Sequence, residues 1–169
     1  MKFLGLIFDT KLTFKNHVQY LKSSCQKALG ILRVVEHTDC GADHIVLLYL
    51  YHALVCSKLD YRSIVYGSAH RSVLKQLDLI HHQGLPIALG AFHTSPAQGL
   101  YVEAHEPSLT SRCLKLSLNY VLKLKSSLKN PAYSCVFEPE NIKLFEESES
   151  KCHLSASAFF HTWRNLNWT

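Results

Sequence analysis

Histidine and cysteine are the residues of this chain best suited to metal chemistry. The sequence contains 11 histidines and 6 cysteines. Five of these side chains fall between residues 37 and 56: His37, Cys40, His44, His52 and Cys56. Imidazole nitrogens and thiolates are ligands that zinc prefers, and four of them complete a tetrahedral site. The spacing matches no compact zinc module, and scattered surface histidines are the alternative, so we expect neither a metal nor another cofactor.

Paired carboxylates and activated nucleophiles do not occur in the sequence pattern. Two-metal phosphoryl transfer needs carboxylates that converge on ions about 4 Å apart, yet no D-D or D-x-D occurs among the aspartates. The chain also has no G-x-S-x-G nucleophile motif and no G-x-x-x-x-G-K-[ST] phosphate loop. We therefore expect no catalytic residue and no enzymatic activity in the chain on its own.

Basic residues form rows that suit contact with a phosphate backbone. Residues 1–130 carry 15 Lys and Arg against 8 Asp and Glu, a net of +7, and residues 131–169 carry 3 against 5, a net of −2. On one predicted helix the cations share a stripe about 90° from the apolar seam, and on a later helix they share about one quadrant. The candidates for phosphate contact are Lys15, Lys22, Arg33, Arg112, Lys115 and Lys123. Such rows bind phosphates without reading base sequence; an ordinary solvated helix face is the alternative.

Helices are expected to carry most of these side chains. Apolar residues recur every three or four positions from Phe14, from Asp43, from Ser72 and from Ser108, and a shorter helix is expected after Ser95. The N-terminus differs, because an apolar run over residues 3–8, a turn-like segment at 9–11 and a second arm at 12–14 predict a β-hairpin. The fold class is therefore mainly α, a helical bundle with a short N-terminal hairpin.

Composition indicates one domain with a sizeable core, because 47% of the residues are hydrophobic and only 18% are charged. The longest uncharged stretch, residues 45–57, is shorter than a membrane span. We therefore expect an intracellular protein, nuclear or cytoplasmic, with no membrane partner. The scattered cysteines predict reduced thiols.

Five stretches in order between residues 3 and 128 resemble the reverse transcriptase of jockey-like non-LTR retrotransposons, in the segment that follows the catalytic palm. They read FLGLIFDTKLTFKNHV, GADHIVLLYLYHALVCSKLDY, SIVYGSAHRSVLKQLDLI, ALGAFHTSPAQGLYVEAHEPSL and LKLSLNYVLKL. The resemblance implies that residues 1–14 form a primer-grip-like hairpin with Phe3, Leu4 and Gly5. It implies a thumb-like helical region over residues 15–130 and an acidic linker and tail over residues 131–169.

The same resemblance implies a function. The family's palm, with its Tyr-x-Asp-Asp motif and magnesium ions, has no counterpart here, so the chain would be a non-catalytic remnant of an RNA-directed DNA polymerase. Its expected partners are the missing palm and a primer–template duplex, bound at most weakly and without sequence preference. A host-adopted module that binds protein or nucleic acid is the alternative, with Phe3, Leu6 and Phe8 as an exposed docking patch.

Two departures from the family bear on stability. Arg62 stands where the family usually has glycine, so a backbone angle there is expected to be strained. The segment Gln83-Gly84-Leu85-Pro86 replaces an ordinary helical stretch and is expected to weaken its helix, since proline costs about 3 kcal/mol and glycine about 1 kcal/mol in a helix interior.

Overall fold

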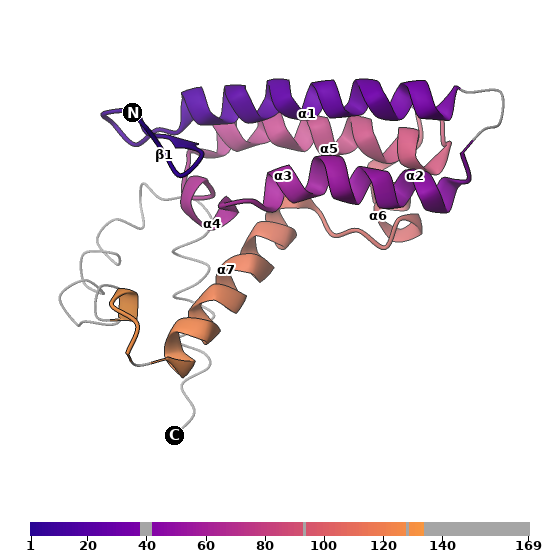
Figure 1. The fold of residues 1–169 in the computed structure, drawn as a ribbon. Helices are drawn as coiled ribbons and strands as arrows, with labels where there is room; N and C mark the ends of the chain where they lie inside the picture. Colours follow the sequence, from indigo (N-terminus) through magenta and orange to yellow (C-terminus); the bar gives the residue numbers. More distant parts are fainter. Residues whose placement is uncertain (38–41, 93, 128, 134–169) are drawn as a thin grey trace.

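The computed structural model describes residues 1–37, 42–92, 94–127 and 129–133, and the remaining residues lie outside this account. Helices dominate the described part, which confirms the mainly α bundle with an N-terminal hairpin (Figure 1). The elements are β1 (Lys2–Phe3), β2 (Leu6–Ile7), α1 (Lys15–Glu36), α2 (His44–Tyr51), η1 (His52–Cys56), α3 (Ser57–Asp60), α4 (Ser63–Tyr66), α5 (Arg71–Leu89), α6 (Ala97–Glu103) and α7 (Leu109–Ser126).

The core lies where α1, α5 and the continuous run α2–η1–α3 pack side by side (Figure 1). The seam expected on α1 is buried there at Phe14, Val18, Leu21, Cys25, Ala28 and Leu32, whereas Val35, its last expected position, is only half-buried. This burial provides the main stabilisation, because each fully buried aliphatic side chain contributes about 1.5–3 kcal/mol. α6 packs on α5, while α7 contacts α3, α4 and α5 near its start and then extends away from the bundle.

A π-helical turn interrupts the second helical run. The buried residues Leu47, Tyr51, Val55 and Leu59 follow one another at steps of four. An α-helix has 3.6 residues per turn, so each step of four overshoots by about 40°. The wider turn at His52–Cys56 takes up part of this drift and keeps one face toward the core. The apolar periodicity from Asp43 predicts Ile45 in the core, but Ile45 is 50% exposed and Leu47 is buried instead.

The hairpin is shorter than expected and turns earlier. Lys2 pairs with Ile7 and Phe3 with Leu6, and the turn is Leu4-Gly5, with φ of 45° and 85°. Two positive φ angles in succession are typical of the tight two-residue hairpin turn, and Gly5 adopts such an angle without a steric penalty. The expected turn at residues 9–11 and the arm at 12–14 were wrong.

The segment after the hairpin instead leads into α1. The Asp9 carboxylate accepts hydrogen bonds from the Thr13 hydroxyl and, at 3.2 Å, from the Phe14 backbone N–H. Phe8 packs edge-on against Phe14 with ring centroids 6.0 Å apart, and Leu6 is buried. The docking patch proposed as the alternative function is therefore wrong for Leu6 and Phe8, and only Phe3 of the three is exposed.

Helix α5 continues through the segment that was expected to weaken it. Gly84 and Pro86 are both buried inside the helix. A Cβ at position 84 would lie closer than 3.0 Å to the Tyr51 ring and 3.1 Å from Leu29, so glycine permits the close approach of neighbouring helices. Pro86 is three residues from the helix end, where Gly90, at φ 62°, and Ala91 donate to the carbonyls of Ile87 and Pro86. These bonds satisfy the carbonyls of the last turn, while Pro86 itself has no N–H to donate to the carbonyl four residues earlier.

Arg62 adopts φ 60° and ψ 23°, the left-handed conformation expected to be strained there. It immediately precedes α4, and its guanidinium lies over the Tyr61 ring, 4.8 Å from the centroid. No helix among the described residues is both long and apolar enough to cross a membrane. Of the acidic linker and tail expected over 131–169, only residues 131–133 are described.

Candidate functional site

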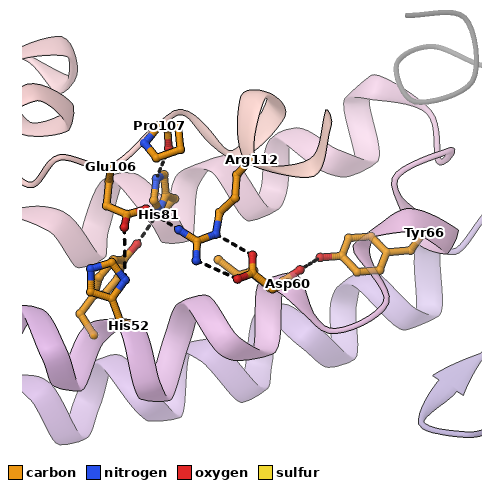
Figure 2. Close-up of polar contacts among 9 residues, drawn as sticks. His52, Asp60, Tyr66, His81, Glu106, Pro107 and Arg112 are labelled. Atoms are coloured by element: carbon orange, nitrogen blue, oxygen red, sulfur yellow. Dashed lines mark hydrogen bonds and ion pairs between the residues drawn. The ribbon is translucent and has the colours of Figure 1, made fainter. Parts of the chain in front are cut away.

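A half-buried network of charges joins α7 to the α2–η1–α3 run. The Arg112 guanidinium in the first turn of α7 donates to both carboxylate oxygens of Asp60, at 2.6 and 2.7 Å. Its other terminal nitrogen donates to Glu106 Oε2 at 2.5 Å. Figure 2 shows the guanidinium held between the two carboxylates. The serine cap at Ser108, which accepts from the Ser111 backbone N–H, starts α7 so that Arg112 faces the end of α3.

The prediction that Arg112 contacts phosphate is corrected by this geometry. Its side chain is only 20% exposed, and its pKa is raised chiefly by the hydrogen bonds to Asp60. Breaking such a pair leaves a buried charge without a partner, which typically costs about 3–5 kcal/mol. Arg112 therefore fixes the position of α7 and is not available to an external anion.

A His–Cys–Glu cluster lies at one end of the same network. Glu106 Oε1 lies 3.2 Å from His52 Nδ1, and the ligand atoms of His52, Cys56 and Glu106 all lie within 4.8 Å of one another. Figure 2 shows Glu106 between His52 and Arg112. Burial raises the pKa of the Cys56 thiol to about 12, while the Arg112 charge opposes this rise. These three residues are the group in the described part of the chain that could hold a metal ion.

The metal ligands considered from the sequence are therefore only partly brought together. His52 and Cys56 share the cluster, whereas His44 is exposed and pairs with its neighbour Asp43 at 2.9 Å. His37 follows the end of α1, and Cys40 lies outside the described residues. Glu106 was missed, because it lies in the connection between α6 and α7, 50 residues beyond Cys56, and nothing in its local sequence indicates that the two meet.

A second polar pair lies behind the cluster. The Tyr51 hydroxyl hydrogen-bonds His81 Nδ1, and His81 Nε2 lies 3.3 Å from the Pro107 carbonyl oxygen. A carbonyl oxygen only accepts, so Nε2 carries the proton and Nδ1 accepts from the tyrosine. Burial lowers the pKa of His81 to about 4. His81 is therefore neutral near pH 7 and holds the α6–α7 connection against α5.

The basic row expected on α1 is present on its solvent face. Lys15 and Arg33 are exposed and Lys22 is half-buried, with Gln19 and Gln26 between them. At 100° per residue, Lys15, Lys22 and Arg33 fall within about 20° of one another. Lys15 and Arg33, the ends of the row, are 18 positions apart, which corresponds to about 27 Å at 1.5 Å per residue. Among the described residues, no acidic side chain forms an ion pair with any of these three cations.

The lysines of α7 form a separate set. Lys115 and Lys123 are exposed, as expected, and α7 contains no Asp or Glu. α7 lies across the α2–η1–α3 run from α1, so these lysines do not extend the row on α1 (Figure 1). The structure thus divides the predicted contacts into a row of three on α1 and a pair on α7.

The primer-grip-like residues lie at the exposed tip of the hairpin. Phe3 and Leu4 are 54% and 62% exposed. The Tyr61 hydroxyl donates to the Leu4 carbonyl at 3.1 Å, which holds the turn against the bundle. A surface pocket of about 340 Å³ lies beside the turn, and its lining includes Gly5, Lys2 and Lys58.

Comparison with known proteins finds no family model, no curated protein and no solved structure that matches this chain.

Proposed function

We propose that the chain binds the phosphate backbone of a nucleic-acid duplex through α1, without catalysing a reaction and without sequence preference. The observation that carries the proposal is the row of Lys15, Lys22 and Arg33 along the solvent face of one long helix. This assignment agrees with the resemblance to the thumb of a non-LTR reverse transcriptase, of which the chain would be a non-catalytic remnant.

The chemistry of the row supports backbone contact. Lysine and arginine neutralise phosphates, and the glutamines Gln19 and Gln26 add neutral donors between them. The helix carries one acid, Glu36, at its last residue, so no carboxylate on α1 competes for the cations in the row.

Salt dependence provides the test. Each neutralised phosphate of B-DNA contributes about −0.9 to the slope of log K against log salt, so three contacts predict a slope of about −3. We expect fluorescence anisotropy with duplexes of unrelated sequence to give this slope and similar affinities. A slope near zero, or a strong preference for one sequence, would overturn the proposal.

A charge-matched pair of variants locates the surface. The triple variant Lys15→Gln, Lys22→Gln, Arg33→Gln should abolish the salt dependence, because it removes the whole row. The control Arg71→Gln, Lys75→Gln, Lys129→Gln removes the same charge from other exposed positions and should retain the slope. Equal losses in both triples would show that overall charge, rather than the row on α1, drives binding.

The pair Lys115→Gln, Lys123→Gln tests whether α7 contributes. Because α7 lies across the bundle from α1, we expect this pair to leave the slope close to that of the unmodified chain. A slope weakened by about two would instead assign a contact to each lysine.

A further inference from the structure

The cluster of His52, Cys56 and Glu106 has the ligand types and spacing of a zinc site. Zinc bonds to His nitrogen, Cys sulfur and carboxylate oxygen are about 2.0–2.3 Å long, which places tetrahedral ligands about 3.3–3.7 Å apart. The observed 3.2 Å between His52 Nδ1 and Glu106 Oε1 already meets that spacing. The sulfur of Cys56 completes a triangle in which every ligand atom lies within 4.8 Å of the others. Only a small contraction would bring all three onto one ion.

The carboxylate of Glu106 is held in the orientation that such an ion needs. Its Oε2 accepts from Arg112 at 2.5 Å, and Arg112 is fixed in turn by Asp60. This leaves Oε1 directed at His52 (Figure 2). Metal-ligating carboxylates in proteins are commonly oriented by hydrogen bonds of this kind, which strengthen metal binding.

The local backbone brings the other two ligands into place. His52 and Cys56 are the first and last residues of η1, the π-helical turn. Turns of this type within α-helices occur frequently at functional sites. Here the turn directs an imidazole and a thiol toward the same carboxylate, which comes from a connection far away in the sequence.

Charge balance also favours a cation at this point. Arg112 contributes one positive charge and faces two carboxylates, Asp60 and Glu106, so the network carries one excess negative charge. No other Lys or Arg among the described residues forms an ion pair with either carboxylate. When a divalent ion binds, the Cys56 thiol loses its proton to solvent, and the site gains one net positive charge. The added positive charge then cancels the excess negative charge of the network.

Solvent can reach the site from the His52 side. The His52 side chain is 33% exposed, whereas Glu106 is 7% exposed. His52 also lines a surface pocket of about 320 Å³, together with His44 and Glu103. His52 is therefore the member of the cluster that an ion arriving from solvent meets first.

We propose that His52, Cys56 and Glu106 bind one zinc ion, which ties the α6–α7 connection to η1. The cluster lies on the side of the α2–η1–α3 run that faces away from α1 (Figures 1 and 2). Zinc binding is therefore independent of the nucleic-acid contact proposed for α1.

Cobalt titration tests the proposal. The tag-free full chain, stripped of metal with a chelator and shown to be folded by circular dichroism, is titrated with Co²⁺ as a spectroscopic substitute for zinc. We expect a thiolate-to-cobalt charge-transfer band that saturates at one equivalent and is displaced by Zn²⁺. Zinc should also raise the midpoint of thermal unfolding, because it binds the folded chain preferentially. A folded chain that gives no such band would overturn the proposal.

Matched cysteine variants assign the band. Cys56→Ser should abolish it, whereas Cys25→Ser, an equally buried cysteine on α1, should leave it intact. It should also survive the triple variant Cys40→Ser, Cys135→Ser, Cys152→Ser. His52→Gln changes a half-exposed side chain outside the Arg112 pairs, so it should fold and weaken cobalt binding by at least about tenfold. A band of full intensity in Cys56→Ser would overturn the assignment.

Discussion

Gly84 connects the packing of the helices to the polar groups behind the candidate metal site. Alanine at this position would place its Cβ closer than 3.0 Å to the Tyr51 ring, whereas carbon atoms in contact normally lie about 3.5–4.0 Å apart. The ring therefore has to move, and with it the hydroxyl that hydrogen-bonds His81. Overpacking of this kind costs about 1–3 kcal/mol, and an unsatisfied buried partner costs about 1–3 kcal/mol more.

The helix preference for alanine works in the opposite direction. Replacing glycine in a helix interior gains about 1 kcal/mol. We therefore expect Gly84→Ala to lower the free energy of unfolding by about 3 kcal/mol. With a urea m-value of about 2 kcal/mol/M, the midpoint of unfolding should fall by about 1.5 M.

Gly30 is the matched control. It lies in the interior of α1, it is exposed, and a Cβ there would meet no atom within 4 Å. Gly30→Ala should raise the free energy of unfolding by about 1 kcal/mol. Urea unfolding of both variants, followed by circular dichroism with the m-value held in common, gives the comparison. A Gly84→Ala chain as stable as the unmodified one would refute the close packing of α5 against Tyr51.

Three further predictions follow from individual side chains. Burial lowers the pKa of His81 to about 4 from an ordinary value of 6.5, so the folded state resists protonation of this side chain. The free energy of unfolding should therefore be highest above pH 6.5 and fall by up to about 3 kcal/mol toward pH 4. His81→Gln should flatten this pH dependence, measured by urea unfolding. Arg112→Gln should lower the free energy of unfolding, measured in urea, by about 3 kcal/mol. It should leave the salt slope of duplex binding, measured by anisotropy, unchanged. A weaker slope would show that Arg112 does contact phosphate. Arg62→Gly should raise the free energy of unfolding by about 1 kcal/mol, measured in urea. The reason is that the left-handed conformation at φ 60° costs a residue with a side chain about 1–2 kcal/mol. The control Lys75→Gly, inside α5, should instead lower the free energy of unfolding.

Features that depend on neighbours along the chain could be predicted from the sequence. The seam of α1 and the basic row beside it both follow from a fixed rotation per residue, so their relative placement holds in the structure. The resemblance predicted a strained backbone angle at Arg62, where the family usually has glycine. Arg62 does adopt the left-handed conformation. The existence of the hairpin was predicted, but its turn was misplaced, because Leu4 itself adopts a positive φ beside Gly5.

Features that depend on residues distant in sequence were decided by the tertiary structure. Arg112 has the same helical spacing as a solvent-facing cation, and only the approach of α3 and the α6–α7 connection gives it Asp60 and Glu106 as partners. Gly84 resembles a helix defect until Tyr51 fills the space beside it. The sequence by itself determined the helices and their polar and apolar faces, because periodicity is local. The packing of those helices decided which polar groups meet, because desolvation and pairing energies depend on distances in space.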